Sequence, residues 1–226
     1  MPRLGVKANG ASPNISQYAA VCLGASNTVS LPTAAGDPVL GIIQEKITAD
    51  GVSASVAAVG ERTRALAYAA ITAGDRLRAA DTSGRVATAA ASLTTALTGS
   101  NNDLVWTALG AFQGEIGDGI TIEYIDPSGA SQSLAVTVHG LRIRVSLATD
   151  TSSAISSTAA QVAAAVAAHA TAKLMVSGAN SGSDDGSGLV TAMAEAGLTG
   201  GAGDFATAEQ AATAQDDQIF ILVGGK

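Results

Sequence analysis

The sequence predicts a mainly β fold, in which a small β-barrel-like base domain is interrupted by an inserted α+β domain. Three observations lead to this prediction. Short β-branched runs bounded by Gly/Asp turns lie near both ends of the chain. Negative charge gathers in the middle, and the one Ala-rich run with high helix propensity lies there too. With 47% hydrophobic but only 3% aromatic residues, the core must consist of Val, Ile, Leu and Ala.

The distribution of charge sets the expected domain boundaries. Residues 1–95 carry eight basic and six acidic side chains, and residues 205–226 carry one basic and three acidic. These two pieces are together neutral, so residues 96–204, with three basic and ten acidic side chains, hold the whole net charge of −7. We therefore expect a base domain of 1–95 plus 205–226 and an acidic, well-solvated insert of 96–204.

A recurring turn pattern predicts the strands of the base domain. An apolar residue followed by Thr-Ala leads into a Gly/Asp turn at 47–52, 71–77 and 212–216. The strands expected around these turns are 52–56, 76–79, 85–88 and 218–223. The last one is continuously apolar from residue 219, so we expect it to be buried on both faces.

The first 16 residues predict an extended N-terminal arm. Residues 1–16 contain two Pro and two Gly and few apolar side chains. We expect this arm to lack stable structure alone and to become ordered on a neighbouring subunit or on a larger assembly.

Strict alternation predicts an antiparallel sheet in the insert. Apolar side chains alternate over 120–124, over 134–138 and over 143–147, and a Pro-containing turn at 126–129 separates the first two runs. A capping box formed by Thr158 and Gln161 predicts one helix that continues to about Lys173.

The end of the insert predicts less regular structure. Residues 177–188 are rich in Gly, Ser and Asp and predict a flexible loop. Residues 189–196 fit either a short helix or a strand, and 114–119 predicts a β-turn rather than a phosphate-binding loop, because its two acidic residues would repel phosphate.

The sequence offers little for catalysis, so we expect no enzyme activity and no cofactor. No motif of a hydrolase, metalloprotease or nucleotide-binding loop occurs. His139 and His169 are interpreted as surface or turn residues, and Cys22 as a buried small apolar residue. Asp184 and Asp185 are a conceivable calcium site, but they lack the spaced ligands of a calcium-binding loop, so no metal site is expected.

Charge and hydropathy exclude two classes of partner. A net charge of −7 argues against nucleic-acid binding, which requires a surplus of Lys and Arg. No apolar run reaches the roughly 18 residues of a membrane-spanning helix, and the first residues lack the apolar core of a signal peptide. We therefore expect synthesis in the host cytoplasm without a membrane partner.

The arginines of the base domain are the candidate contact residues. The candidates, with two basic residues of the arm, are Arg3, Lys7, Arg62, Arg64, Arg76, Arg78 and Arg85. A spacing of two puts 62 with 64, and 76 with 78, on one strand face. Two interpretations remain open: a solvated face paired with Glu61, Asp75 and Asp81, or a surface that meets acidic groups of a partner protein.

Four segments of the base domain resemble the small head-decoration, or capsid-cement, proteins of bacteriophages. They are DPVLGIIQE at 37–45, AITAGDRLR at 70–78, DTSGRV at 81–86 and AATAQDDQIFILV at 211–223. This resemblance implies a β-barrel-like fold, no enzyme activity, and binding to an assembled head lattice, commonly as trimers. The insert, at 101–108 and 119–124, resembles a module that recurs in phage virion proteins, and this second resemblance assigns it no role.

The resemblance therefore implies a structural virion protein that binds the outer surface of an assembled capsid. Its expected partner is the major capsid protein, and a homo-oligomer, with a trimer favoured, is expected. Two alternatives stay open: a tail or fibre component that assembles through the insert, and a carbohydrate-binding adhesion module. The latter usually needs exposed aromatic rings, and only Trp106, three Tyr and three Phe are available.

Overall fold

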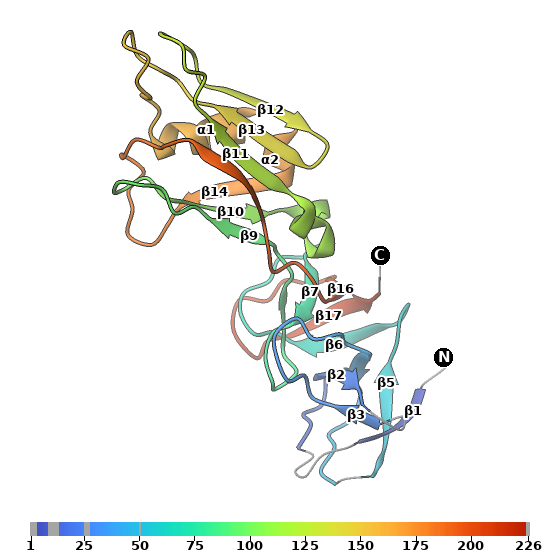
Figure 1. Ribbon diagram of the computed structural model, residues 1–226. Helices are drawn as coiled ribbons and strands as arrows, with labels where there is room; N and C mark the ends of the chain where they lie inside the picture. The colour runs from blue at the N-terminus through green and yellow to red at the C-terminus, as the bar shows by residue number, and fades with distance from the viewer. Residues whose placement is uncertain (1–3, 9–13, 25–27, 50, 225–226) are drawn as a thin grey trace. The chain divides into compact units, whose positions relative to one another are not determined.

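The computed structural model describes residues 4–8, 14–24, 28–49 and 51–224, and it is mainly β, as predicted (Figure 1). The chain divides into two compact units. The base unit comprises Met1–Ala89 and Ala202–Lys226, and the inserted unit comprises Ala90–Gly201. These limits lie a few residues from the boundaries expected from charge.

The first sheet of the base unit closes into a five-stranded barrel. Its strands are β1 Leu4–Ala8, β2 Ala20–Leu23, β3 Thr28–Ser30, β4 Gly41–Ile43 and β5 Ser53–Ala57, in the order β1-β3-β2-β4-β5. β1 pairs in parallel with β3 and antiparallel with β5, which closes the ring.

The prediction of an extended arm over 1–16 is wrong for two of its parts. Residues 4–8 form the closing strand of the barrel, and the buried Ile15 exchanges backbone hydrogen bonds with Ile47 at 3.1 and 3.0 Å. Residues 1–3 and 9–13 lie outside the described part of the chain. In residues 4–8, pairing with β3 and β5 offsets the poor intrinsic strand propensity.

The second sheet of the base unit joins segments far apart in the sequence. Its strands are β6 Arg62–Leu66, β7 Arg76–Ala79, β8 Val86–Thr88, β16 Asp204–Ala208 and β17 Gln218–Val223, in the order β6-β17-β16-β7-β8. A parallel bridge between Ala67 and Val86 connects the two ends, so the sheet is curled. β7 and β17 have the predicted bounds, whereas β5 and β8 each begin one residue later than predicted.

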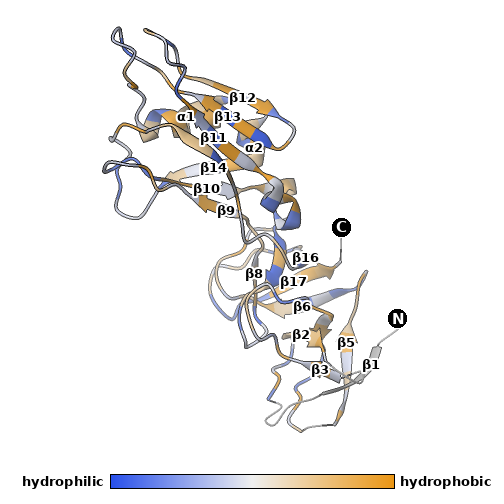
Figure 2. Cartoon of the chain, in the orientation of Figure 1, coloured by the Kyte–Doolittle hydropathy of each residue, from blue (hydrophilic) through white to orange (hydrophobic). Residues whose placement is uncertain are grey.

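The expectation that the last strand is buried on both faces is wrong. Burial alternates along β17: Ile219, Ile221 and Val223 are buried, whereas Phe220 and Leu222 are 42% and 37% exposed. After Gln218 the strand is hydrophobic (Figure 2), but the sheet packs on the core through one face only. β17 therefore presents apolar side chains on its outer face.

The same hydrogen-bonded turn occurs twice in the base unit. The carboxylate of Asp37 accepts hydrogen bonds from Thr33 N, Thr33 Oγ1 and Ala34 N at 2.7, 2.8 and 3.0 Å. The carboxylate of Asp217 accepts the same three bonds from Thr213 and Ala214, at 2.8, 3.1 and 3.0 Å. These bonds lower the pKa of both carboxyl groups. The repeated turn pattern in the sequence predicts the second turn at residues 212–216. The structure extends it by one residue, to Asp217, whose carboxylate accepts the three bonds.

The inserted unit contains two sheets and its helices around one core. One sheet has the order β14-β10-β9 and the other β12-β13-β11-β15. The strands are β9 Ser92–Thr94, β10 Leu104–Ala108, β11 Thr121–Ile125, β12 Ala135–His139, β13 Arg142–Ser146, β14 Val176–Asn180 and β15 Met193–Gly197. The helices are η2 Gly110–Phe112, η3 Gly114–Gly119, α1 Ala159–Ala168 and α2 Ala172–Met175.

The predicted sheet of the insert is only partly antiparallel. β12 and β13 form the expected antiparallel hairpin, with Gly140 at φ 62° in its turn. β13, rather than β12, lies beside β11, and these two strands run in parallel. β12 therefore lies at the edge of the sheet, and β13 lies between β12 and β11.

The predicted capping box is present, but the predicted helix is too long. Thr158 Oγ1 accepts a hydrogen bond from Gln161 N at 3.3 Å, and Gln161 Oε1 accepts one from Thr158 N at 2.9 Å. α1 ends before His169, whose extended backbone breaks the run. Nδ1 of His169 then accepts bonds from the first N–H groups of α2, so two short helices replace one.

Three further segments of the insert differ from or refine the prediction. Residues 176–180 form β14, which overlaps the start of the loop expected at 177–188. Residues 114–119 form a 3-10 helix instead of a β-turn. Of the two alternatives for 189–196, the strand is present as β15.

Candidate functional site

The outer face of β6 and β17 carries the candidate contact residues that are most exposed. Arg62 and Arg64 both point to this face, as the spacing of two predicted, because Thr63 and Ala65 are buried between and after them. Register places Arg62 opposite Leu222 and Arg64 opposite Phe220. We call Arg62, Arg64, Phe220 and Leu222 the β6–β17 face.

The two arginines of this face differ in their partners. Arg62 Nε lies 2.6 Å from Glu209 Oε2 in an ion pair. Arg64 Nη1 donates to the amide oxygen of Gln218 at 3.2 Å, and its guanidinium carbon lies 5.2 Å from the centre of the Phe220 ring. Among the described residues, Arg64 has no carboxylate within ion-pair distance, so its charge is uncompensated there.

Arg76 and Arg78 are less available than the sequence suggested. Arg76 pairs with Asp204 through Nη2 at 2.7 Å and Nε at 2.8 Å, and the Asp204 side chain is only 5% exposed. The Nε of Arg78 is buried without a hydrogen-bond partner among the described residues. Both arginines are half-buried, so they support the sheet more than they offer a contact surface.

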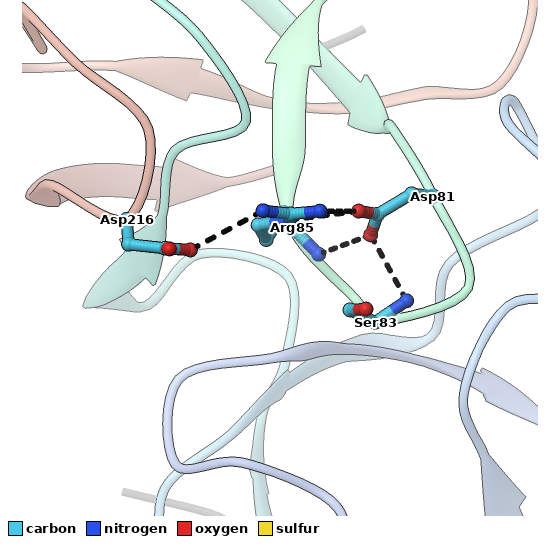
Figure 3. A network of polar contacts seen from close by, with 4 residues as sticks. All are labelled: Asp81, Ser83, Arg85 and Asp216. Atoms are coloured by element: carbon cyan, nitrogen blue, oxygen red, sulfur yellow. Dashed lines mark hydrogen bonds and ion pairs between the residues drawn. The ribbon is translucent and has the colours of Figure 1, made fainter.

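Arg85 is held on several sides by its own chain (Figure 3). It forms a short ion pair with Asp81 and a second one with Asp216 at 3.5 Å, and its guanidinium carbon lies 5.0 Å from the centre of the Tyr68 ring. Burial alone would raise the pKa of Asp81, but hydrogen bonds from Arg85 and Ser83 and the guanidinium charge lower it. Arg85 thus ties the β7–β8 turn to the segment before β17, which is a structural role.

The structure does not describe the side chains of the remaining two candidates, Arg3 and Lys7. Arg3 lies outside the described residues, and of Lys7 only the backbone is described, as part of β1. The seven candidates therefore do not form one site: the structure brings two of them together on an exposed face.

The arginines have acidic partners beyond those expected. Asp81 pairs with Arg85, and Glu61 Oε2 accepts a hydrogen bond from Ala58 N at 3.2 Å. Asp75 accepts bonds from Thr72 N and Thr88 Oγ1, both at 2.9 Å. The partners Glu209 and Asp204 lie more than a hundred residues from their arginines, so sequence spacing could not reveal them.

A small apolar pocket lies at the ends of β16 and β17. It encloses about 290 Å³ and is lined by Val39, Leu40, Val59, Asp204, Phe205, Val223 and Gly224. Val59, in the β5–β6 turn, is 78% exposed. The Asp204 carboxylate pairs with Arg76, and most of the other lining side chains are apolar.

The other polar residues singled out in the sequence do not assemble into a reactive site. No group of three His, Cys, Asp or Glu side chains in the described part of the chain could hold a metal ion. Asp184 Oδ2 accepts a hydrogen bond from Asp103 N at 3.0 Å, which joins its loop to the start of β10, and Asp185 Oδ1 accepts one from Ser187 N at 2.9 Å within a turn. Cys22 is half-buried rather than buried, and burial, with the charge of Asp37, raises the pKa of its thiol.

Two broader observations complete the description. Within the described residues, no helix is both long and apolar enough to span a membrane. Comparisons with protein-family models, with curated proteins and with solved structures find no match.

Proposed function

We propose that the protein is a structural, non-enzymatic component of a bacteriophage virion, which binds the outer surface of an assembled capsid and stabilises it by bridging capsomers. Two kinds of support exist. The four segments that resemble capsid-cement proteins all belong to the base unit. The observation that carries the proposal is the β6–β17 face, where Phe220 and Leu222 are exposed next to two arginines.

The composition of this face favours a protein partner. Aromatic side chains and arginine are enriched at protein–protein interfaces and dominate their binding energy. Covering apolar surface contributes about 25 cal/mol per Å², so Phe220 and Leu222 would each add on the order of 1 kcal/mol when a partner covers them. The solvated face of an antiparallel sheet commonly carries polar side chains, whereas this face exposes Phe220 and Leu222.

Stabilisation of the capsid follows from mass action. A protein that binds the assembled lattice but not the free capsid subunits stabilises the lattice by RT ln(1 + [L]/Kd), about 2.7 kcal/mol per site at one hundred times Kd. The proposed partner is the major capsid protein, and a trimer of this chain is the proposed oligomer, as the resemblance implies. The acidic inserted unit, with three basic and nine acidic side chains, would contact solvent or neighbouring subunits.

Among the alternatives, carbohydrate binding finds the least support. Trp106, the only tryptophan in the chain, is fully buried and so cannot stack on a sugar, and the exposed rings of Phe220 and Tyr68 each already lie against an arginine. A tail or fibre role would use the same exposed face for a different virion partner, so the position of the protein on the particle separates the two proposals.

The thermal stability of decorated heads tests the proposal. Heads of the phage that encodes this chain would be stripped of it, then heated with and without added purified protein, and release of DNA would be recorded. Decorated heads are expected to rupture several degrees higher. Equal rupture temperatures, with the protein shown to be bound, would contradict the cement role.

A further inference from the structure

The β6–β17 face combines an uncompensated cation with exposed apolar surface. Arg64 has no carboxylate partner among the described residues, and its guanidinium lies over the ring of Phe220, which is itself 42% exposed. By contrast, Arg62 is paired with Glu209. Arg64 is therefore the arginine of this face whose charge is left for a partner.

The register extends this surface across the sheet. Leu222 lies opposite Arg62 on one side and opposite Thr207 on the other, and Thr207 lies opposite Arg76. Neighbouring strands are about 4.8 Å apart, so this row spans about 14 Å. Its two ends are ion pairs of this chain, and Leu222 and Thr207 lie between them. The exposed apolar surface of this row is therefore Leu222, beside Phe220 on the same strand.

Charge argues for an acidic partner rather than a second copy of the same face. Where a twofold axis passes close to Arg64, two copies packed face to face would bring their uncompensated Arg64 side chains towards each other, and like charges at an interface are costly. A carboxylate would instead gain a charge-assisted hydrogen bond from the guanidinium. An apolar side chain of the partner beside that carboxylate would cover the exposed surface of Phe220 and Leu222.

We infer that the β6–β17 face binds a surface segment of the capsid protein that presents an Asp or Glu carboxylate to Arg64 and an apolar side chain to Phe220 and Leu222. This inference rests on the proposed function and names the partner chemistry of its binding surface. The guanidinium is already oriented by Gln218 and by the aromatic ring, so little side-chain freedom is lost when the carboxylate binds.

The test uses the full chain and capsids assembled from the major capsid protein of the same phage. Arg64→Glu and Phe220→Ser are the test variants. Lys173→Glu and Leu174→Ser, both on exposed positions of α2 in the inserted unit, are matched controls for the change in charge and in apolar surface. Co-sedimentation measures affinity, and thermal unfolding verifies that each variant is folded. If Arg64→Glu unfolds, Arg64→Gln replaces it, because a neutral side chain also removes the carboxylate's partner.

We expect at least about a tenfold loss of capsid affinity for both test variants, as for central interface residues, and less than a twofold change for both controls. Folded test variants that bind as tightly as the wild type would overturn the inference and leave the proposed function intact. A wild-type chain that does not bind capsids at all would overturn both. A test variant that changes the mass of the free protein in sedimentation would assign the face to a second copy and would also overturn the inference.

Discussion

Trp106 donates its indole N–H to the hydroxyl oxygen of Tyr124 over 2.8 Å, and both side chains are buried in the core of the inserted unit. Trp106 belongs to β10 and Tyr124 to β11, so this bond connects the two sheets of the unit. Burial raises the pKa of the Tyr124 hydroxyl well above its ordinary value, so the group stays neutral further into the alkaline range.

Replacing Tyr124 with Phe should destabilise the inserted unit. The variant leaves the indole N–H of Trp106 buried without an acceptor, which costs about 1–3 kcal/mol. Urea unfolding, followed through the fluorescence of the single tryptophan, measures the free energy of unfolding of this unit. Tyr68→Phe is the control, since Tyr68 is exposed and its ring contact with Arg85 is retained. Equal midpoints for the two variants would contradict the role given to the hydroxyl.

Gly178→Ala should also destabilise the inserted unit. A methyl group on Gly178 of β14 would lie 2.5 Å from Cζ3 of the buried Trp106, so the ring or the strand must move. Overpacking of this kind costs about 1–3 kcal/mol. Gly197→Ala on β15 is the control, because the added methyl group would lie 3.9 Å from its nearest neighbour beyond the adjacent residues, the carbonyl oxygen of Ile120. The same urea measurement should give a lower midpoint for Gly178→Ala only, and a wild-type midpoint would show that the site is not tightly packed.

The contact between Gly178 and Trp106 also explains why local sequence does not reveal the strand β14. Local composition made 177–188 a flexible loop, because Gly and Ser are poor strand formers. A bulky ring on the neighbouring strand requires a residue without a side chain there, and this requirement is visible only once the pairing of β10 with β14 is known. By contrast, the alternation over 120–124 and 143–147 and the capping box at Thr158 are local signals, and the sequence predicts β11, β13 and the start of α1 from them.

The stability of the base unit should fall in acid through Asp81. The pKa of Asp81 is lowered in the folded protein, whereas in the unfolded chain it is about 3.9. The folded state therefore favours the ionised carboxylate more than the unfolded chain does. The stabilisation is therefore complete above about pH 4 and is lost as the pH falls through the lowered pKa. Asp81→Asn removes this contribution, so its thermal midpoint should fall less than that of the wild type between pH 5 and 2. An unchanged pH dependence would contradict the account of the Arg85 contacts.

Excision of the inserted unit tests the division of the chain. The entry and exit of this unit are joined by hydrogen bonds between Ser92 and Thr199 at 2.8 and 3.0 Å. Joining Ala89 to Ala202 through a short Gly/Ser linker should leave a soluble, folded base unit with nine basic and ten acidic side chains. Circular dichroism should show a β spectrum and a cooperative thermal transition. An insoluble or unfolded product would show that the two units depend on each other.

The structure changes where this cut should be made. A junction between Thr95 and Phe205, the boundary expected from charge, would leave β9 behind and would remove Asp204, the partner of Arg76. The charge pattern located the insert because acidic residues concentrate in it. It placed Asp204 in the wrong unit, since one acidic residue beside a boundary carries no information about its partner.

The sequence predicts one half of the β6–β17 face and misses the other half. Alternation placed Arg62 and Arg64 on one exposed face, which needs only the period of a strand. The exposure of Phe220 and Leu222 was missed, because an unbroken apolar run fits a strand buried on both faces as well as one buried on a single face. Which of these applies depends on what packs on the sheet, and that is a property of the fold.

Image reconstruction of the virion, with the protein labelled at its C-terminus, tests the central proposal most directly. The proposed function predicts density for the label on the outer surface of the head, at positions that repeat with the capsid lattice, and loss of that density when the gene is deleted. Label density confined to the tail or fibres, with the head surface unchanged by the deletion, would contradict it.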